Sequence, residues 1–186
     1  MNLKGIISSV KLENFDIRYV IRGLIDGSLS SLGVVIGASS GDVSIIVAAG
    51  IGGGVANGIS NILGALTAER AVLEGKRSSQ EKVLLKEAGS LKKTSFYKEA
   101  LNKTAISGIG DGISTAFGSI IPVLPFLFLD KQTAIIVAIL ITLSILFILG
   151  IFIGKISKEN LAISGFKMVI GGLLVTLISF IIEHLI

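Results

Sequence analysis

The chain contains no cysteine and no tryptophan, a single histidine, and few charged residues. The absence of cysteine excludes disulfides, thiolate metal sites and covalent haem attachment. The histidine, His184, lies beside Glu183 close to the C-terminus, a place more typical of a helix-end anchor than of a ligand set. There is no HExxH motif, no Walker loop and no Ser/His/Asp arrangement. The sequence therefore predicts that the protein is not an enzyme.

Charged residues make up only 16% of the chain, whereas soluble domains average about 25%. The gaps between them are apolar stretches of about 20 residues, the length needed for a helix to cross a bilayer core. These stretches are 19–38, 43–68, 107–129, 133–154 and 162–182. They predict an all-α membrane protein with five transmembrane helices. The expected divisions are an N-terminal interfacial helix over 1–18, two spans over 19–68, a short cytoplasmic helical segment over 69–106, and three spans over 107–186.

The basic residues lie almost entirely on one side of the predicted membrane. Of 17 lysines and arginines, all but Lys131 fall in the N-terminal segment, in residues 69–103 or in the turn before the fifth span. The positive-inside rule places that side in the cytoplasm, with the N-terminus inside and the C-terminus outside. The expected location is a prokaryotic plasma membrane. The net charge of +4 is then explained by contact with anionic lipid, and no basic run with interleaved aromatics predicts nucleic-acid binding.

A short motif occurs twice at an offset of 85 residues. "GLIDGSLSSLGVVI" starts at Gly23 and "GIGDGISTAFGSII" starts at Gly108, with Gly-x-x-Asp-Gly in both. The same offset superposes the second apolar stretch on the fourth without a gap. This predicts a parallel internal repeat of helical hairpins, with Asp26 and Asp111 at similar depth. The fourth stretch has almost no polar residues, so the polar chemistry is expected on the first three helices.

Those three helices carry a set of residues with oxygen ligands inside the predicted membrane. Carboxylate, amide and hydroxyl oxygens suit hard divalent cations, and intramembrane carboxylates mark ion or proton routes. The candidate metal ligands are Asp26, Ser30, Asn57, Asn61 and Asp111. Two simpler interpretations stay open. Asp26 would pair with Arg22, four residues earlier, and the small-residue stripes would serve only helix packing.

The order of these motifs resembles the vacuolar iron transporter family. The matching stretches, in chain order, are "IDGSLSSLGVVIGASSG", "GIGGGVANGISNILGAL", "GSIIPVLPFLF" and "GFKMVIGGLLVTLISFII". The resemblance implies export of ferrous iron, and in some members manganese, from the cytosol in exchange for protons, with no permanently bound cofactor. It also implies a homodimer whose path lies between the first helices. Asp26 then matches the metal-coordinating aspartate, and Gly33 and Gly37 would pack at the dimer contact.

The chain also departs from the family pattern. Asn61 and Ala65 stand where the family has a methionine and a glutamate, and loss of the thioether weakens any preference for ferrous iron over harder ions. Plant and protozoan members carry a glutamate-rich metal-capture segment. Here the segment has nine basic residues, and its candidate capture residues are Glu69, Glu74 and Glu81. Gly75 and the Gly89–Ser90 pair are expected to break it into short helices. The rival functions are transport of another ion or small solute on the same scaffold, and a non-transporting role in membrane assembly.

The charge distribution generates a test of topology. Because the native chain has no cysteine, the single variant Ser79→Cys provides one reactive thiol in the segment expected in the cytoplasm. A membrane-impermeant maleimide added to intact cells should leave it unlabelled, and permeabilised cells should label it fully. Labelling from outside would contradict the assignment.

Overall fold

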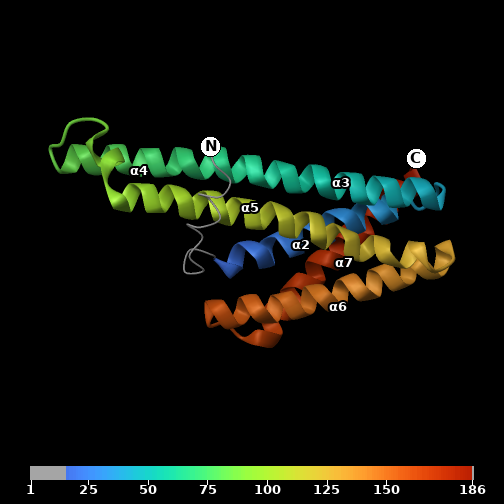
Figure 1. Ribbon diagram of the computed structural model, residues 1–186. Helices are drawn as coiled ribbons and strands as arrows, with labels where there is room; N and C mark the ends of the chain where they lie inside the picture. The colour runs from blue at the N-terminus through green and yellow to red at the C-terminus, as the bar shows by residue number, and fades with distance from the viewer. Residues whose placement is uncertain (1–15, 186) are drawn as a thin grey trace.

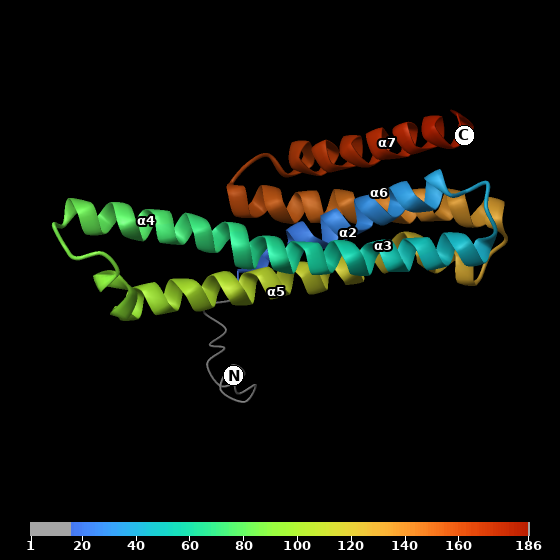
Figure 2. The same ribbon diagram turned by 90° about the horizontal axis from the view of Figure 1, so that it is seen from above.

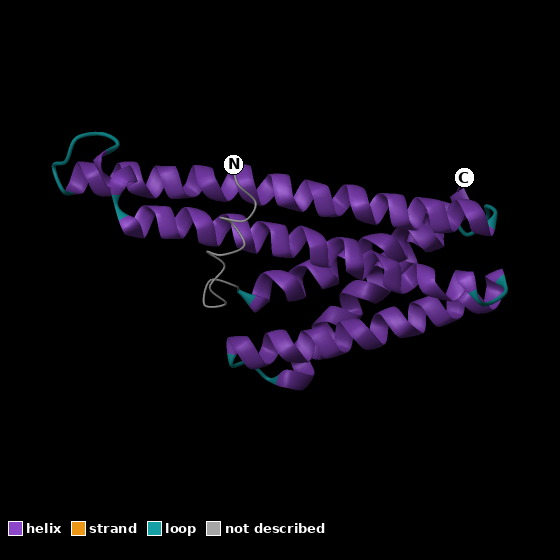
Figure 3. Ribbon diagram, in the orientation of Figure 1, coloured by secondary structure: helices purple, strands orange, loops and turns teal. Residues whose placement is uncertain are grey.

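The computed structural model describes residues 16–185, and its frame is five long helices. These are α2 (Ile17–Gly37), α3 (Val43–Gly64), α5 (Ser95–Val123), α6 (Lys131–Ser157) and α7 (Leu161–Leu185). Each is part of a helix long and apolar enough to cross a membrane, and the described residues contain no strand (Figure 3). The expected all-α fold with five spans is therefore confirmed. The orientation of the termini and the internal repeat stay predictions, and the interfacial helix expected over 1–18 falls almost wholly outside the described residues.

The second span does not end at the membrane. Helix α3 passes through a π-helical turn, Ala65–Glu69, into α4 (Arg70–Val83), which makes one helix of 41 residues, Val43–Val83. Such a helix is about 60 Å long, whereas a bilayer core is about 30 Å thick. Helix α4 and the first part of α5 thus form a hairpin that extends well past the other helices (Figure 1).

The expected break at Gly75 is wrong, because α4 runs through this residue without interruption. Glycine lowers helix stability but keeps its N–H and C=O groups in the hydrogen-bond ladder, so a single glycine need not end a helix. The break expected at Gly89–Ser90 is confirmed, since the chain turns at Gly89, where φ is +86°. That left-handed conformation suits glycine because it has no Cβ atom. Thr94 then caps α5, its hydroxyl accepting a hydrogen bond from the Tyr97 N–H at 3.3 Å.

Helices α2, α3 and α5 pack at backbone distance through glycines. A Cβ atom built on Gly27 of α2 would lie 2.0 Å from the carbonyl oxygen of Thr115 on α5. One built on Gly118 of α5 would lie 2.6 Å from the Leu24 oxygen of α2, and one on Gly58 of α3 would lie 2.6 Å from the Gly112 oxygen of α5. Small residues allow this approach in a membrane, where packing replaces the hydrophobic effect as the force between helices.

Helices α6 and α7 form a second pair beside this three-helix unit (Figure 2). Gly150 and Gly154 of α6 lie against Ser164 and Gly165 of α7, again within distances that a Cβ atom would not allow. Large apolar side chains of α7 are exposed, as expected of a helix that faces lipid; they include Ile170, Leu174, Leu177 and Ile181. The apolar fourth span thus packs against the fifth, and at its start Lys131 Nζ donates to the Gly41 carbonyl oxygen between α2 and α3 at 3.3 Å.

The α2–α5 contact predicts a difference between two glycines of the same helix. Gly27→Ala would force the helix backbones apart, since its Cβ would lie 2.0 Å from a backbone oxygen. We expect it to destabilise the protein by about 1–3 kcal/mol, the usual cost of overpacking. The matched control is Gly37→Ala, where nothing lies within 4 Å. Thermal unfolding in detergent measures both, and equal melting temperatures would contradict the packing described here.

Candidate functional site

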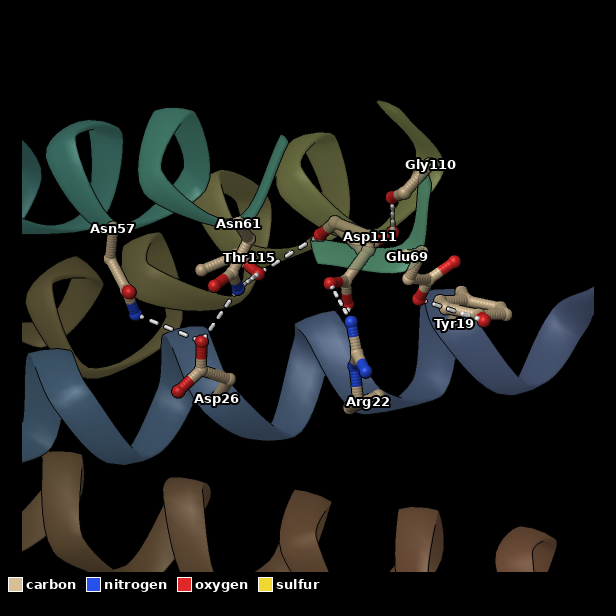
Figure 4. A network of polar contacts seen from close by, with 10 residues as sticks. Tyr19, Arg22, Asp26, Asn57, Asn61, Glu69, Gly110, Asp111 and Thr115 are labelled. Carbon is tan, nitrogen blue, oxygen red and sulfur yellow. Dashed lines mark hydrogen bonds and ion pairs between the residues drawn. The ribbon is translucent and has the colours of Figure 1, made fainter. Parts of the chain in front are cut away.

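The side chain of Asp26 on α2 is held between two amides of α3 (Figure 4). The Asn57 Nδ2 donates to Asp26 Oδ2 at 3.1 Å, and the Asn61 Nδ2 donates to the same oxygen at 2.7 Å. The two asparagines are four residues apart, so they lie one above the other on one face of α3. Asp26 itself is half-buried. With Ser30, described next, the structure brings together four of the five predicted ligands.

Two hydroxyl groups extend this cluster. Asn57 Nδ2 also donates to Ser30 Oγ at 3.2 Å, and Asn61 Nδ2 donates to Thr115 Oγ1 on α5 at 2.9 Å. Thr115 is fully buried, and its own hydroxyl donates to the main-chain oxygen of Asp111 at 2.9 Å. Thr115 was not among the predicted ligands. The sequence feature that could have indicated Thr115 is its spacing of four residues from Asp111, which places both on one face of α5.

The cluster can adopt two hydrogen-bonding states. Each asparagine carries two N–H donors and one carbonyl oxygen at the end of the same side chain. As drawn, the donors of Asn57 and Asn61 satisfy the carboxylate of Asp26. Rotation of the terminal amides would turn their oxygens toward the same point, beside the carboxylate and the hydroxyl of Ser30. The site can thus be a closed hydrogen-bonded network or a set of oxygen ligands.

Asp111 lies outside this cluster, in contrast to the expected arrangement. Its side chain is 0% exposed and forms an ion pair with Arg22. The interpretation in which Arg22 pairs with Asp26 is therefore wrong: the guanidinium is bound to α5. A carboxylate without solvent inside a membrane protein is stable only with a partner, and Arg22 is that partner.

Two comparisons with known proteins identify the family of this chain. The model of the VIT family matches residues 83–184. The chain is also 61% identical to an uncharacterized protein of Methanocaldococcus jannaschii over 183 residues, which is 98% of this chain and 95% of that protein. The chain belongs to the VIT family. The resemblance to vacuolar iron transporters is confirmed, and the kind of function that this family supports is membrane metal-ion transport.

In this VIT-family chain, the three candidate capture glutamates each bind a neighbour in the same molecule. Glu69 accepts a hydrogen bond from the Tyr19 hydroxyl at 3.0 Å. Glu74 binds Arg77 at 2.9 Å and also accepts from the Tyr97 hydroxyl. The described residues contain no group of three His, Cys, Asp or Glu side chains placed to hold a metal. Each of these carboxylates thus has a structural role within the protein, and metal capture by the segment stays a prediction.

Glu81 shows that structural role most clearly. Its side chain is only 3% exposed, and it accepts hydrogen bonds from the backbone N–H groups of Gly89 and Leu91, each at 2.9 Å. Arg77, one turn earlier on α4, forms an ion pair with it. The carboxylate thereby fastens the loop between α4 and α5 to the end of α4.

The two glycines expected at the dimer contact differ in their surroundings. A Cβ on Gly33 would lie 3.3 Å from Ser179 Oγ and 3.3 Å from Val175 Cγ1, so Gly33 faces α7 of its own chain. Gly37 has nothing within 4 Å of such an atom. A role at a dimer contact therefore stays a prediction for Gly37, whereas Gly33 already serves a contact within the subunit.

The role of Glu81 leads to a prediction about the hairpin loop. Glu81→Ala removes the acceptor of two backbone N–H groups, so the amides of Gly89 and Leu91 should exchange with deuterium about tenfold faster or more. Glu87→Ala, which removes the same charge from an exposed position in the loop, should leave those amides unchanged. Equal exchange in wild type and Glu81→Ala would show that the carboxylate does not hold the loop.

Proposed function

We propose that this protein exports divalent metal cations, ferrous iron or manganese, from the cytosol in exchange for protons. The membrane in question is the plasma membrane of a prokaryote. The observation that carries the proposal is the half-buried carboxylate of Asp26 between the amides of Asn57 and Asn61, inside the three-helix unit. Burying a carboxylate in a membrane is costly, which favours a functional reason for its position.

The ligand types favour a hard or borderline cation. Asp26, Ser30, Asn57 and Asn61 offer carboxylate, hydroxyl and amide oxygens within hydrogen-bond distance of one another. Such oxygen sets suit manganese, magnesium and calcium, whereas ferrous iron gains more from nitrogen or sulfur ligands. With asparagine at position 61, we expect manganese to be carried at least as well as ferrous iron.

Exchange of metal for protons is explained if the Asp26 carboxylate binds either a metal ion or a proton. A metal ion and a proton compete for the same oxygens of Asp26, so binding of one releases the other. The second intramembrane carboxylate, Asp111, is neutralised by Arg22. When the metal leaves, the asparagine N–H groups can return to the carboxylate, so that the emptied site keeps its hydrogen bonds.

The charge balance supports a homodimer. One Asp26 carries a single negative charge and balances only half the charge of a divalent cation. Two copies of the site, facing one another across the first helices as the family resemblance implies, would supply two negative charges. In this arrangement the metal is the cargo of the site, and no cofactor is permanently bound.

Flux measurements test the proposal directly. Purified protein in proteoliposomes should carry Mn²⁺ and Fe²⁺. A pH gradient that is acidic on the side toward which the metal moves should accelerate the flux. Asp26→Asn keeps the size of the side chain and removes its charge, so metal flux and its dependence on the pH gradient should both fall at least about tenfold. Thermal unfolding should show that the variant stays folded.

The matched control is Asp42→Asn, the same chemical change at an exposed residue before α3. It should transport like wild type. Near-normal metal flux through Asp26→Asn would remove the role proposed for this residue. Flux of a different ion or solute by wild type, without flux of divalent metals, would favour the rival transporter on the same scaffold.

A further inference from the structure

Arg22 and Asp26 have the spacing of a helical ion pair and yet do not pair. They are four residues apart on α2, and arginine and aspartate at this spacing attract one another on a helix surface. In the structure, both side chains point toward the α3–α5 side of α2 (Figure 4). Arg22 binds the carboxylate of Asp111 on α5, with Nε 3.3 Å from Oδ1, whereas Asp26 binds the amides of α3.

The position of Arg22 depends on Asp111 more than on its other neighbours. Asp111 is 0% exposed, whereas the Arg22 side chain is 58% exposed. The guanidinium also lies over the ring of Tyr19, 4.9 Å from its centre. Cation–π contacts of an exposed arginine are weak compared with a charge-assisted bond to a buried carboxylate. Without the carboxylate of Asp111, the ring alone would retain the arginine.

We propose that Asp111 is a positioning residue that withholds Arg22 from Asp26 and so keeps the carboxylate of the metal site open to cations. This inference rests on the function proposed for Asp26. Asp111 contacts neither the asparagines nor Asp26 through its side chain; it acts by binding the one arginine that stands a helical turn from the site.

If Asp111 loses its charge, Arg22 can bind either of two other carboxylates, those of Glu69 and Asp26. Glu69 already accepts the hydroxyl of Tyr19 at 3.0 Å. Asp26, one turn along the same helix, is held only by neutral amides. A guanidinium binds a carboxylate more strongly than an amide does, because both groups are charged. Arg22 would then neutralise Asp26 and compete with metal and proton alike, so Asp111→Asn should impair transport.

A suppression experiment tests this. Asp111→Asn should lower Mn²⁺ flux in proteoliposomes at least about tenfold, because it allows an arginine to occupy the transported ion's carboxylate. The double variant Arg22→Gln/Asp111→Asn removes that arginine and should restore flux to within about threefold of wild type. It should also remain folded, since replacing both members of a buried ion pair by neutral groups is often tolerated.

The matched control is Arg18→Gln/Asp111→Asn. It removes an arginine from the same helix, one turn further from Asp26, where the side chain is bound to Asp16. The total charge equals that of the first double variant, but Arg22 is still present, so flux should stay low. Equal restoration by both double variants would overturn the specific role of Arg22, and near-normal flux through Asp111→Asn alone would overturn the proposal.

A crystal structure of Asp111→Asn separates this inference from the function on which it rests. The inference expects the Arg22 guanidinium within hydrogen-bond distance of the Asp26 carboxylate. Arg22 still remote from Asp26 would overturn it, whatever the flux. If wild type carries no divalent metal, the proposed function fails, and the crystal structure still decides whether Asp111 withholds the arginine.

Discussion

The close approach of α2 and α5 is the constraint on which the other features depend. Asp, Asn, Ser and Thr have short side chains, and they touch across helices only where the helix backbones nearly touch. Glycines at positions 23, 27 and 118 provide that approach, since a Cβ at any of them would overlap the neighbouring helix. These glycines place α5 against α2, and α3 packs on α5 through Gly58 and Gly112, which brings the short side chains of Asn57 and Asn61 to Asp26.

The polar side chains around Arg22 and Asp26 are linked to one another. The Tyr19 hydroxyl donates to Glu69, and the Arg22 guanidinium lies over the ring of Tyr19. Arg22 also pairs with Asp111, which links α2 to α5. Through its main-chain oxygen, Asp111 holds the hydroxyl of Thr115, and Thr115 in turn accepts from Asn61. The membrane core holds no water, so the cost of burying these polar side chains is offset by the hydrogen bonds that they make to one another.

The length of the apolar stretches and the spacing of polar residues were enough to predict five spans and the meeting of Asp26 with Asn57 and Asn61. They could not predict where the second helix ends, because charged residues mark the membrane boundary and leave helix formation unaffected.

The partner of Arg22 could not be predicted from the sequence either. Asp26 and Asp111 are both reachable from that position, and only the three-dimensional path of α5 decides between them. Gly33 had the spacing of a subunit contact, yet it serves α7, since a small-residue pattern does not specify which helix it faces.

The uninterrupted helix Val43–Val83 has a mechanical consequence. It carries Asn57 and Asn61 near its middle and the tip of the α4–α5 hairpin at its end, about 30 Å further along the axis. A straight helix transmits twist and tilt along its length, so the hairpin acts as a lever arm on the two amides. The π-helical turn at Ala65–Glu69 lies between the two amides and the hairpin, and its irregular hydrogen bonding is a place where long helices bend.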